Sequence, residues 1–76
     1  MECFLDELRP GEGALVTEMF AGAALNRRLS EFGMVPQTAV HCRYWGPDGH
    51  LTALELRGAV IAVRRADLKQ IAARRL

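Results

Sequence analysis

The sequence predicts a mainly β fold, a small antiparallel β-barrel of about five strands with one α-helix inserted after the first strand and a helical turn before the last. Three observations predict it. Short alternating or β-branched segments are separated by turns containing glycine and proline. The apolar period changes once to that of a helix, from Ala23 onward. The chain has 76 residues, 50% of them hydrophobic, which suits one small core and is too short for two domains. Residues 1–76 are therefore expected to form a single domain.

The N-terminal part is predicted to contain a turn and then the first strand. Residues 1–10 are followed directly by Gly11, and the dipeptide Pro10-Gly11 is typical of turns. Residues 13–19 follow with the β-branched Val16 and Thr17 and are bounded by glycines. This second segment is the first predicted strand.

An α-helix is predicted next, because apolar side chains recur at the i, i+4 and i+7 positions of one helix face. These side chains are Leu25, Leu29 and Phe32. On the polar face, Arg27 and Glu31 have the spacing of an i,i+4 ion pair.

The helix is expected to end at Gly33, which can adopt the left-handed conformation of a C-terminal cap. Met34 follows in a position to pack back on the last turn, and Pro36 prevents the helix from resuming.

The second half is predicted to form an antiparallel meander of three strands, then a helical turn and a final strand. Alternating polarity, two turns and short apolar runs define the segments. They are residues 38–45, the turn 46–49, residues 51–57, residues 59–64, the helical turn 66–70 and the strand 71–76.

Tyr44 and Trp45 are adjacent on a predicted strand, so their side chains must point to opposite faces. Alternation places Tyr44 with Val40 and Cys42 on one face, and we expect that face to be the core. Trp45, beside the turn, is then expected to be exposed, where an aromatic ring often anchors a contact.

The predicted strands can close around one apolar core, with the helix stripe covering an open end of the barrel. Closure also removes exposed sheet edges. This organisation is SH3-like. The expected core residues of the strands are Leu15, Val40, Leu54, Leu56, Val60 or Ile61, and Val63.

Charge and hydropathy exclude several classes of protein. No apolar run reaches the roughly 18 residues of a membrane-spanning helix, and the N-terminus lacks the pattern of a signal peptide, so the cytoplasm is the expected compartment. The net charge of +1 argues against a strongly basic nucleic-acid binder. The charges are nevertheless uneven: residues 1–38 hold three basic and six acidic side chains, and residues 39–76 hold seven basic and three acidic ones.

No catalytic constellation is found, so we expect no enzyme activity, no catalytic residue and no cofactor. The sequence has no GxSxG motif, no GxxxxGK[ST] loop and no GxGxxG loop. Nor does it contain a CxxC pair, and no metal site is assigned within the chain. A metal site shared between chains stays open, and its ligands would be Cys3, His41, Cys42 and His50.

The segment from Arg27 to Pro36, Arg-Arg-Leu-Ser-Glu-Phe-Gly-Met-Val-Pro, resembles the FeoA family, ferrous iron transport protein A. The family's segment is two basic residues, Leu-x-x-Leu/Met-Gly-Met/Leu-x-Pro-Gly. The resemblance extends from about Leu5 to Ile71. It includes the opening turn with Pro10-Gly11-Glu12 and the closing segments 56–58 and 61–68. Gln37 departs from the pattern, because the family usually has glycine there.

The resemblance implies an SH3-like cytoplasmic domain that supports bacterial ferrous iron uptake without catalytic or iron-carrying residues. The expected partner is FeoB, an inner-membrane permease with a cytosolic GTP-binding domain, which would bring the chain to the inner face of that membrane. The partner-binding surface is expected on the polar helix face and the following turn, with Trp45 as a second site. The candidate residues are Arg27, Arg28, Glu31, Met34 and Trp45.

Three other functions remain open. The domain also resembles the C-terminal domain of DtxR-type metal-dependent repressors. A stand-alone regulatory domain of that kind is less favoured, because the chain begins with Met1 and has no helix-turn-helix. The second is a small-barrel nucleic-acid-binding module using the arginine-rich half, although no nucleic acid is the expected partner. The third is an oligomer bridged by metal.

Overall fold

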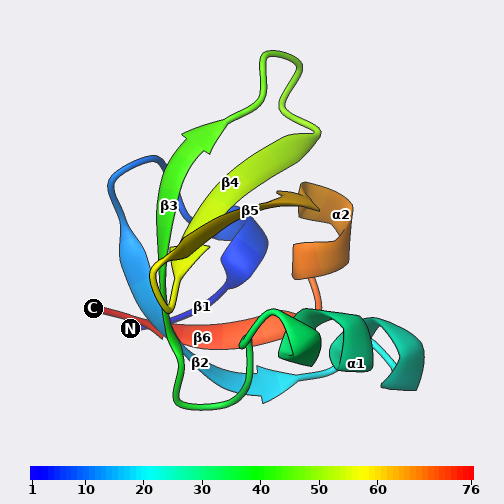
Figure 1. Ribbon diagram of the computed structural model, residues 1–76. Helices are drawn as coiled ribbons and strands as arrows, with labels where there is room; N and C mark the ends of the chain where they lie inside the picture. The colour runs from blue at the N-terminus through cyan, green and yellow to red at the C-terminus, as the bar shows by residue number, and fades with distance from the viewer.

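Six antiparallel strands form one strongly curved sheet in the order β1-β6-β2-β3-β4-β5, as seen in a computed structural model that describes all residues, 1–76 (Figure 1). The mainly β, SH3-like fold class is confirmed. The elements are β1 (Glu2–Phe4), a 3-10 turn η1 (Leu5–Glu7), β2 (Gly13–Met19), α1 (Ala23–Glu31), β3 (Ala39–Trp45), β4 (Leu51–Leu56), β5 (Ala59–Arg64), α2 (Arg65–Leu68) and β6 (Ile71–Arg75).

The N-terminal segment, predicted as a turn, contains a sixth strand that the sequence did not indicate. β1 pairs antiparallel with β6, and Cys3 lies opposite Ala73. The 3-10 turn follows at once, where the Glu7 carboxylate accepts a hydrogen bond of 2.8 Å from the Phe4 N–H. A strand of three residues leaves little periodicity to detect, and its partner lies at the other end of the chain.

α1 ends where the sequence predicts, but its apolar stripe is shorter. Gly33 has φ +96°, and the Met34 N–H donates to the Leu29 carbonyl at 3.0 Å, which returns the chain over the last turn. Leu29 is buried, whereas Phe32 is 57% exposed. The expected core position of Phe32 is wrong because Phe32 is the C-cap residue, with φ −89° and ψ 0°, so its side chain leaves the helix stripe.

Gln37 adopts a left-handed backbone conformation, which glycine adopts at little cost. Its φ is +78°, and its N–H donates to the Val16 carbonyl at 2.7 Å. A non-glycine residue therefore occupies a left-handed position here, which costs an L-residue about 1–2 kcal/mol.

A bulge in β3 reverses the two adjacent aromatic side chains relative to the prediction. The register with β4 shifts between Cys42 and Tyr44, so Tyr44 lies opposite Ala53. Tyr44 is 60% exposed, and Trp45 is half-buried against the core. The expectation of an exposed Trp45 is therefore wrong, because regular alternation does not cross a bulge.

The core lies inside the curve of the sheet and includes residues from all six strands, η1, α1 and α2. Two predicted members change: Leu15 is only half-buried while Val16 is buried, and Val60 is exposed while Ile61 packs against the core. The largest fully buried side chains are Leu5, Leu8, Met34, Leu54, Leu56, Leu68, Ile71, Val16, Val40 and Cys42.

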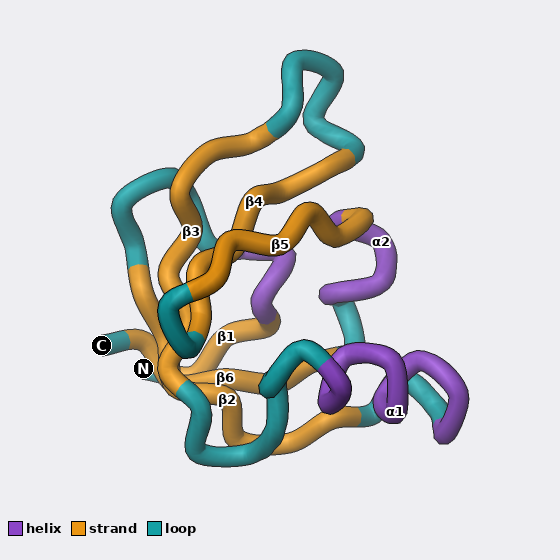
Figure 2. Tube along the Cα trace, in the orientation of Figure 1, coloured by secondary structure: helices purple, strands orange, loops and turns teal.

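α1 and the two chain termini lie at opposite ends of the molecule. Figure 2 shows α1 on one side of the sheet and both termini on the other. None of the helices is long and apolar enough to cross a membrane.

Candidate partner-binding surface

A mainly apolar groove of about 370 Å3 lies between α1 and β5. It is open to solvent along the surface. Its lining side chains come from α1 and its C-cap residue, from the start of β4, from β5 and from α2. They are Leu25, Arg28, Leu29, Phe32, Leu51, Ile61, Ala62, Val63, Arg64 and Asp67.

Local structure explains why apolar side chains meet in this groove. Leu25 and Leu29 belong to the inward stripe of α1, whereas Phe32 leaves that stripe at the helix end and stays exposed at the groove. On the other wall, Ile61 packs against the core and Leu51 is exposed. The groove therefore presents apolar surface that the chain itself does not cover.

Two arginines flank the groove. Arg28, exposed on α1, forms no ion pair or side-chain hydrogen bond. Arg64 lies 3.6 Å from the Asp67 carboxylate, with most of its side chain exposed. The groove rim therefore has one cation without an acidic partner, at Arg28.

The five predicted contact residues do not all reach one surface. Arg27, Arg28 and Glu31 are exposed on α1, but the expected ion pair between Arg27 and Glu31 does not form. Met34 is fully buried beneath the helix end, so its side chain supports α1 from below and offers no surface to a partner.

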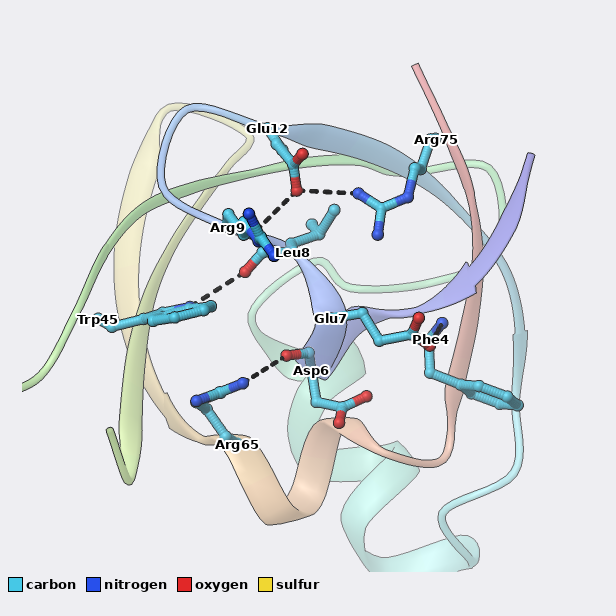
Figure 3. A network of polar contacts seen from close by, with 9 residues as sticks. All are labelled: Phe4, Asp6, Glu7, Leu8, Arg9, Glu12, Trp45, Arg65 and Arg75. Carbon is cyan, nitrogen blue, oxygen red and sulfur yellow. Dashed lines mark hydrogen bonds and ion pairs between the residues drawn. The ribbon is translucent and has the colours of Figure 1, made fainter. Parts of the chain in front are cut away.

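Trp45, the remaining predicted contact residue, does not line the groove and belongs to a separate polar network (Figure 3). Its indole N–H donates to the Leu8 carbonyl at 3.0 Å. The Arg65 guanidinium lies 4.2 Å from the centre of the Trp45 ring and donates to the Asp6 carbonyl at 3.0 Å and the Gly49 carbonyl at 3.3 Å. The ring therefore joins the N-terminal turn to β3.

The same view shows a second connection, made by the Glu12 carboxylate (Figure 3). One of its oxygens accepts hydrogen bonds of 2.8 Å from the Arg9 N–H and from the Arg75 guanidinium. The hydrogen bond from the Arg9 N–H, which has the larger effect, and the one from Arg75 hold the pKa of Glu12 below its usual value. The hydrogen bond to Glu12 also raises the pKa of Arg75.

The potential metal ligands do not converge. No three of the histidine, cysteine, aspartate and glutamate side chains form a cluster that could hold a metal ion. Cys42 is buried with its sulfur 3.4 Å from the Thr52 hydroxyl, and Cys3 is buried with its pKa raised by burial. Because both thiols lie inside the core, a metal site between chains cannot use the four predicted ligands as they stand.

Sequence reasoning missed Phe32 and Leu51 as groove residues. One signal was present. Leu51 stands outside the alternating face of Thr52, Leu54 and Leu56, so an apolar side chain was available on the other face of that strand. Phe32 gave no such signal, because its spacing fits the buried stripe.

The profile of the FeoA domain matches residues 3–75 of the sequence. The chain belongs to the FeoA family. The match includes nearly every residue of the fold, so the family assignment applies to the whole domain. Among curated protein sequences there is no significant match to the chain.

Two solved FeoA structures illustrate the likeness. FeoA from Chlorobium tepidum is 28% identical, with a TM-score of 0.92 over 97% of this chain and 70% of that one. FeoA from Stenotrophomonas maltophilia, solved in complex with zinc, is 27% identical, with a TM-score of 0.76 over 93% and 88% of the two chains. That protein is described as a prokaryotic SH3-domain protein and a candidate ferrous iron transport activating factor.

The FeoA fold also occurs within a larger protein. A manganese-dependent transcriptional repressor matches with a TM-score of 0.89 at 13% identity, over 99% of this chain and 41% of that chain. At this identity the likeness concerns the fold alone.

Proposed function

We propose that this FeoA-family protein is an accessory factor of bacterial ferrous iron uptake that binds the cytosolic part of a FeoB-type permease through the α1–β5 groove. The observation that carries the proposal is the unfilled apolar groove next to Arg28, with Phe32 exposed at its wall. In this proposal the protein works in the cytoplasm, at the inner face of the inner membrane.

The energetics of such a contact favour the groove over the ion pairs of the surface. An aromatic ring beside a hollow can be covered by a partner with a gain in apolar burial, and interface energy usually concentrates in a few such residues with arginine among them. The charged groups in the ion pairs elsewhere on the surface are already paired and at least partly exposed to solvent, so they contribute less binding energy to a partner.

Contact alone suffices for an accessory role. A bound protein shifts the equilibrium between conformations of its partner by the difference in its affinity for them. No catalytic or metal-carrying residue of this chain is required for that effect.

Reversing the charges of α1 tests the proposal. The double variant Arg27→Glu with Arg28→Glu is expected to fold normally, because both side chains are exposed, and to lose co-purification with the detergent-solubilised permease. The matched control is Lys69→Glu with Arg74→Glu, which makes the same charge change at two exposed side chains outside the groove and should retain binding.

Three results would count against this function. Failure of the wild-type chain to co-purify rejects the permease as partner, and normal ferrous iron uptake after deletion of its gene rejects the role in uptake. Equal loss of binding in the control variant shows that net charge, and not the groove, governs the contact.

A second candidate function is a regulatory domain like that of DtxR-type metal-dependent repressors. The fold likeness to the manganese-dependent repressor favours it. A gene for a GTP-binding permease next to the gene of this chain favours iron uptake, whereas a gene for a metal-dependent repressor lacking its C-terminal domain favours regulation.

A further inference from the structure

β5 is an edge strand with one side free along its length. It pairs with β4 alone, and no other strand of the sheet follows it. The α1–β5 groove lies along this strand, and four of its lining residues, from Ile61 to Arg64, are consecutive in β5.

The register of the hairpin identifies the free main-chain groups. Arg57 and Gly58, with φ +51° and +80°, form the two-residue turn, so Leu56 and Ala59 are the hydrogen-bonded pair next to it. Hydrogen-bonded and non-hydrogen-bonded pairs then alternate along the strands. The N–H and C=O groups of Val60 and Ala62 and the N–H of Arg64 therefore point away from β4, at the free edge, whereas the Arg64 C=O belongs to the N-cap of α2.

This edge has few of the features that protect edge strands from pairing. β5 contains no proline and keeps an unbroken register with β4 over all six residues. Its only charged side chain is Arg64, at its end. The opposite edge of the sheet, β1, is three residues long. Short strands, bulges, prolines and charges are the usual protection, so β5 is the edge open to strand addition.

A partner that fills the groove also removes water from this edge. Buried main-chain donors and acceptors must then find hydrogen-bond partners. A helix cannot supply them, since its own main-chain groups are paired internally. We infer that the partner enters the groove as an extended segment that pairs with β5 as an added strand.

The side chains of the groove define the chemistry of that segment. This step rests on the proposed function, because it describes how the permease would occupy the same groove. Side chains alternate along an added strand, so an apolar residue can meet Phe32 and Ile61 while its neighbours face solvent. Arg28, which has no acidic partner of its own, suits an Asp or Glu in the segment.

Amide hydrogen exchange of this chain, free and bound to the detergent-solubilised FeoB-type permease, tests the pairing directly. On binding, the amides of Val60, Ala62 and Arg64 should gain protection, because only these amides of β5 are free to donate to a new strand. Those of Ile61 and Val63, already bonded to β4, should change less.

A pair of variants at one exposed position gives the second test. Ala62→Pro removes an outward N–H that β5 does not use for its bond to β4, and proline is tolerated at such edge positions. Ala62→Ser keeps the N–H. We expect Ala62→Pro to weaken binding of the permease about tenfold or more and Ala62→Ser to leave it within about twofold. Amide exchange of β3 and β4 verifies that both variants fold.

The outcomes separate the inference from the proposed function. If the wild-type chain and Ala62→Pro bind the permease equally, or protection appears on α1 alone, the added strand is rejected and the proposed function stands. If the wild-type chain does not bind the permease, both are rejected. If the β5 amides become protected in the chain alone as its concentration rises, the strand belongs to a second copy, and the inference is again wrong.

Discussion

Glu12 connects the turn before β2 to β6 through a single carboxylate oxygen, which accepts from the Arg9 N–H and the Arg75 guanidinium. Its pKa in the folded chain is below the usual 4.5. The ionised form therefore stabilises the fold above about pH 4.5, and this contribution is lost as the pH falls through the folded pKa.

Glu12→Gln should lower the melting temperature at neutral pH and have progressively less effect in acid. Glutamine cannot ionise, so it lacks the pH-dependent part of the stabilisation that the carboxylate provides. Thermal melts of both proteins from neutral pH to below the usual Glu pKa measure the difference. A gap that stays constant over that range would show that the charge of Glu12 contributes nothing.

Gly33→Ala should destabilise the fold for two separable reasons. The left-handed backbone, with φ +96°, costs an L-residue about 1–2 kcal/mol. In addition, the new Cβ would lie 2.5 Å from the Arg57 side chain, whose Nε donates to the Gly33 carbonyl at 3.1 Å. Urea denaturation of Gly33→Ala, with and without Arg57→Ala, separates the two by a double-mutant cycle.

Gly11→Ala is the control for this cycle, because Gly11 has φ +92° with no atom near the position of the new Cβ. It should show the backbone cost alone, and Arg57→Ala should not change it. If Gly33→Ala costs the same in both backgrounds, the contact with Arg57 is not a steric constraint.

Among the helices and strands, the sequence predicts the ones that are specified by patterns within their own stretch of residues. The bounds of β2 and β5 and the glycine end of α1 agree with the structure, because β-branched residues, alternation and glycine act on their own neighbourhood. β1 and the bulge of β3 were missed. Both depend on strands that are distant in sequence, so no local pattern encodes them.

The bulge also explains why the candidate site was only partly predicted. Regular alternation directs Trp45 outward, whereas one extra residue in β3 turns the ring inward and Tyr44 outward. Arg27 and Arg28 are exposed on α1, as the polar spacing of the helix predicts, because that spacing is a local property. Phe32 required the geometry of the helix end.

Trp45→Phe should cost about 1 kcal/mol of unfolding free energy, because phenylalanine cannot make the hydrogen bond to the Leu8 carbonyl. Circular dichroism during urea denaturation measures this loss. Tyr44→Phe is the control and should change stability by less than about 0.5 kcal/mol, since Tyr44 is exposed. A larger cost for Tyr44→Phe than for Trp45→Phe would contradict the orientation of the two rings.

For the whole molecule, topology disperses the charge asymmetry of the two halves. The basic strand β6 lies between β1 and β2, both from the acidic half, and Arg75 pairs with Glu12 across the halves. A division that is clear along the sequence therefore does not become two opposing faces. The strand order decides where the charged segments lie in space. That order depends on pairings between strands that are distant in the sequence, so no short stretch of sequence reveals it.

The meeting of the two chain ends has a consequence for architecture. The Arg75 N–H donates to the Met1 carbonyl at 2.8 Å, and both ends emerge on the side away from α1 (Figure 1). A neighbouring domain attached at either end would leave the groove accessible, and the adjacent ends would allow insertion of this fold into a loop of another domain. The fold is thus suited to modular use, in agreement with its presence as 41% of a repressor chain.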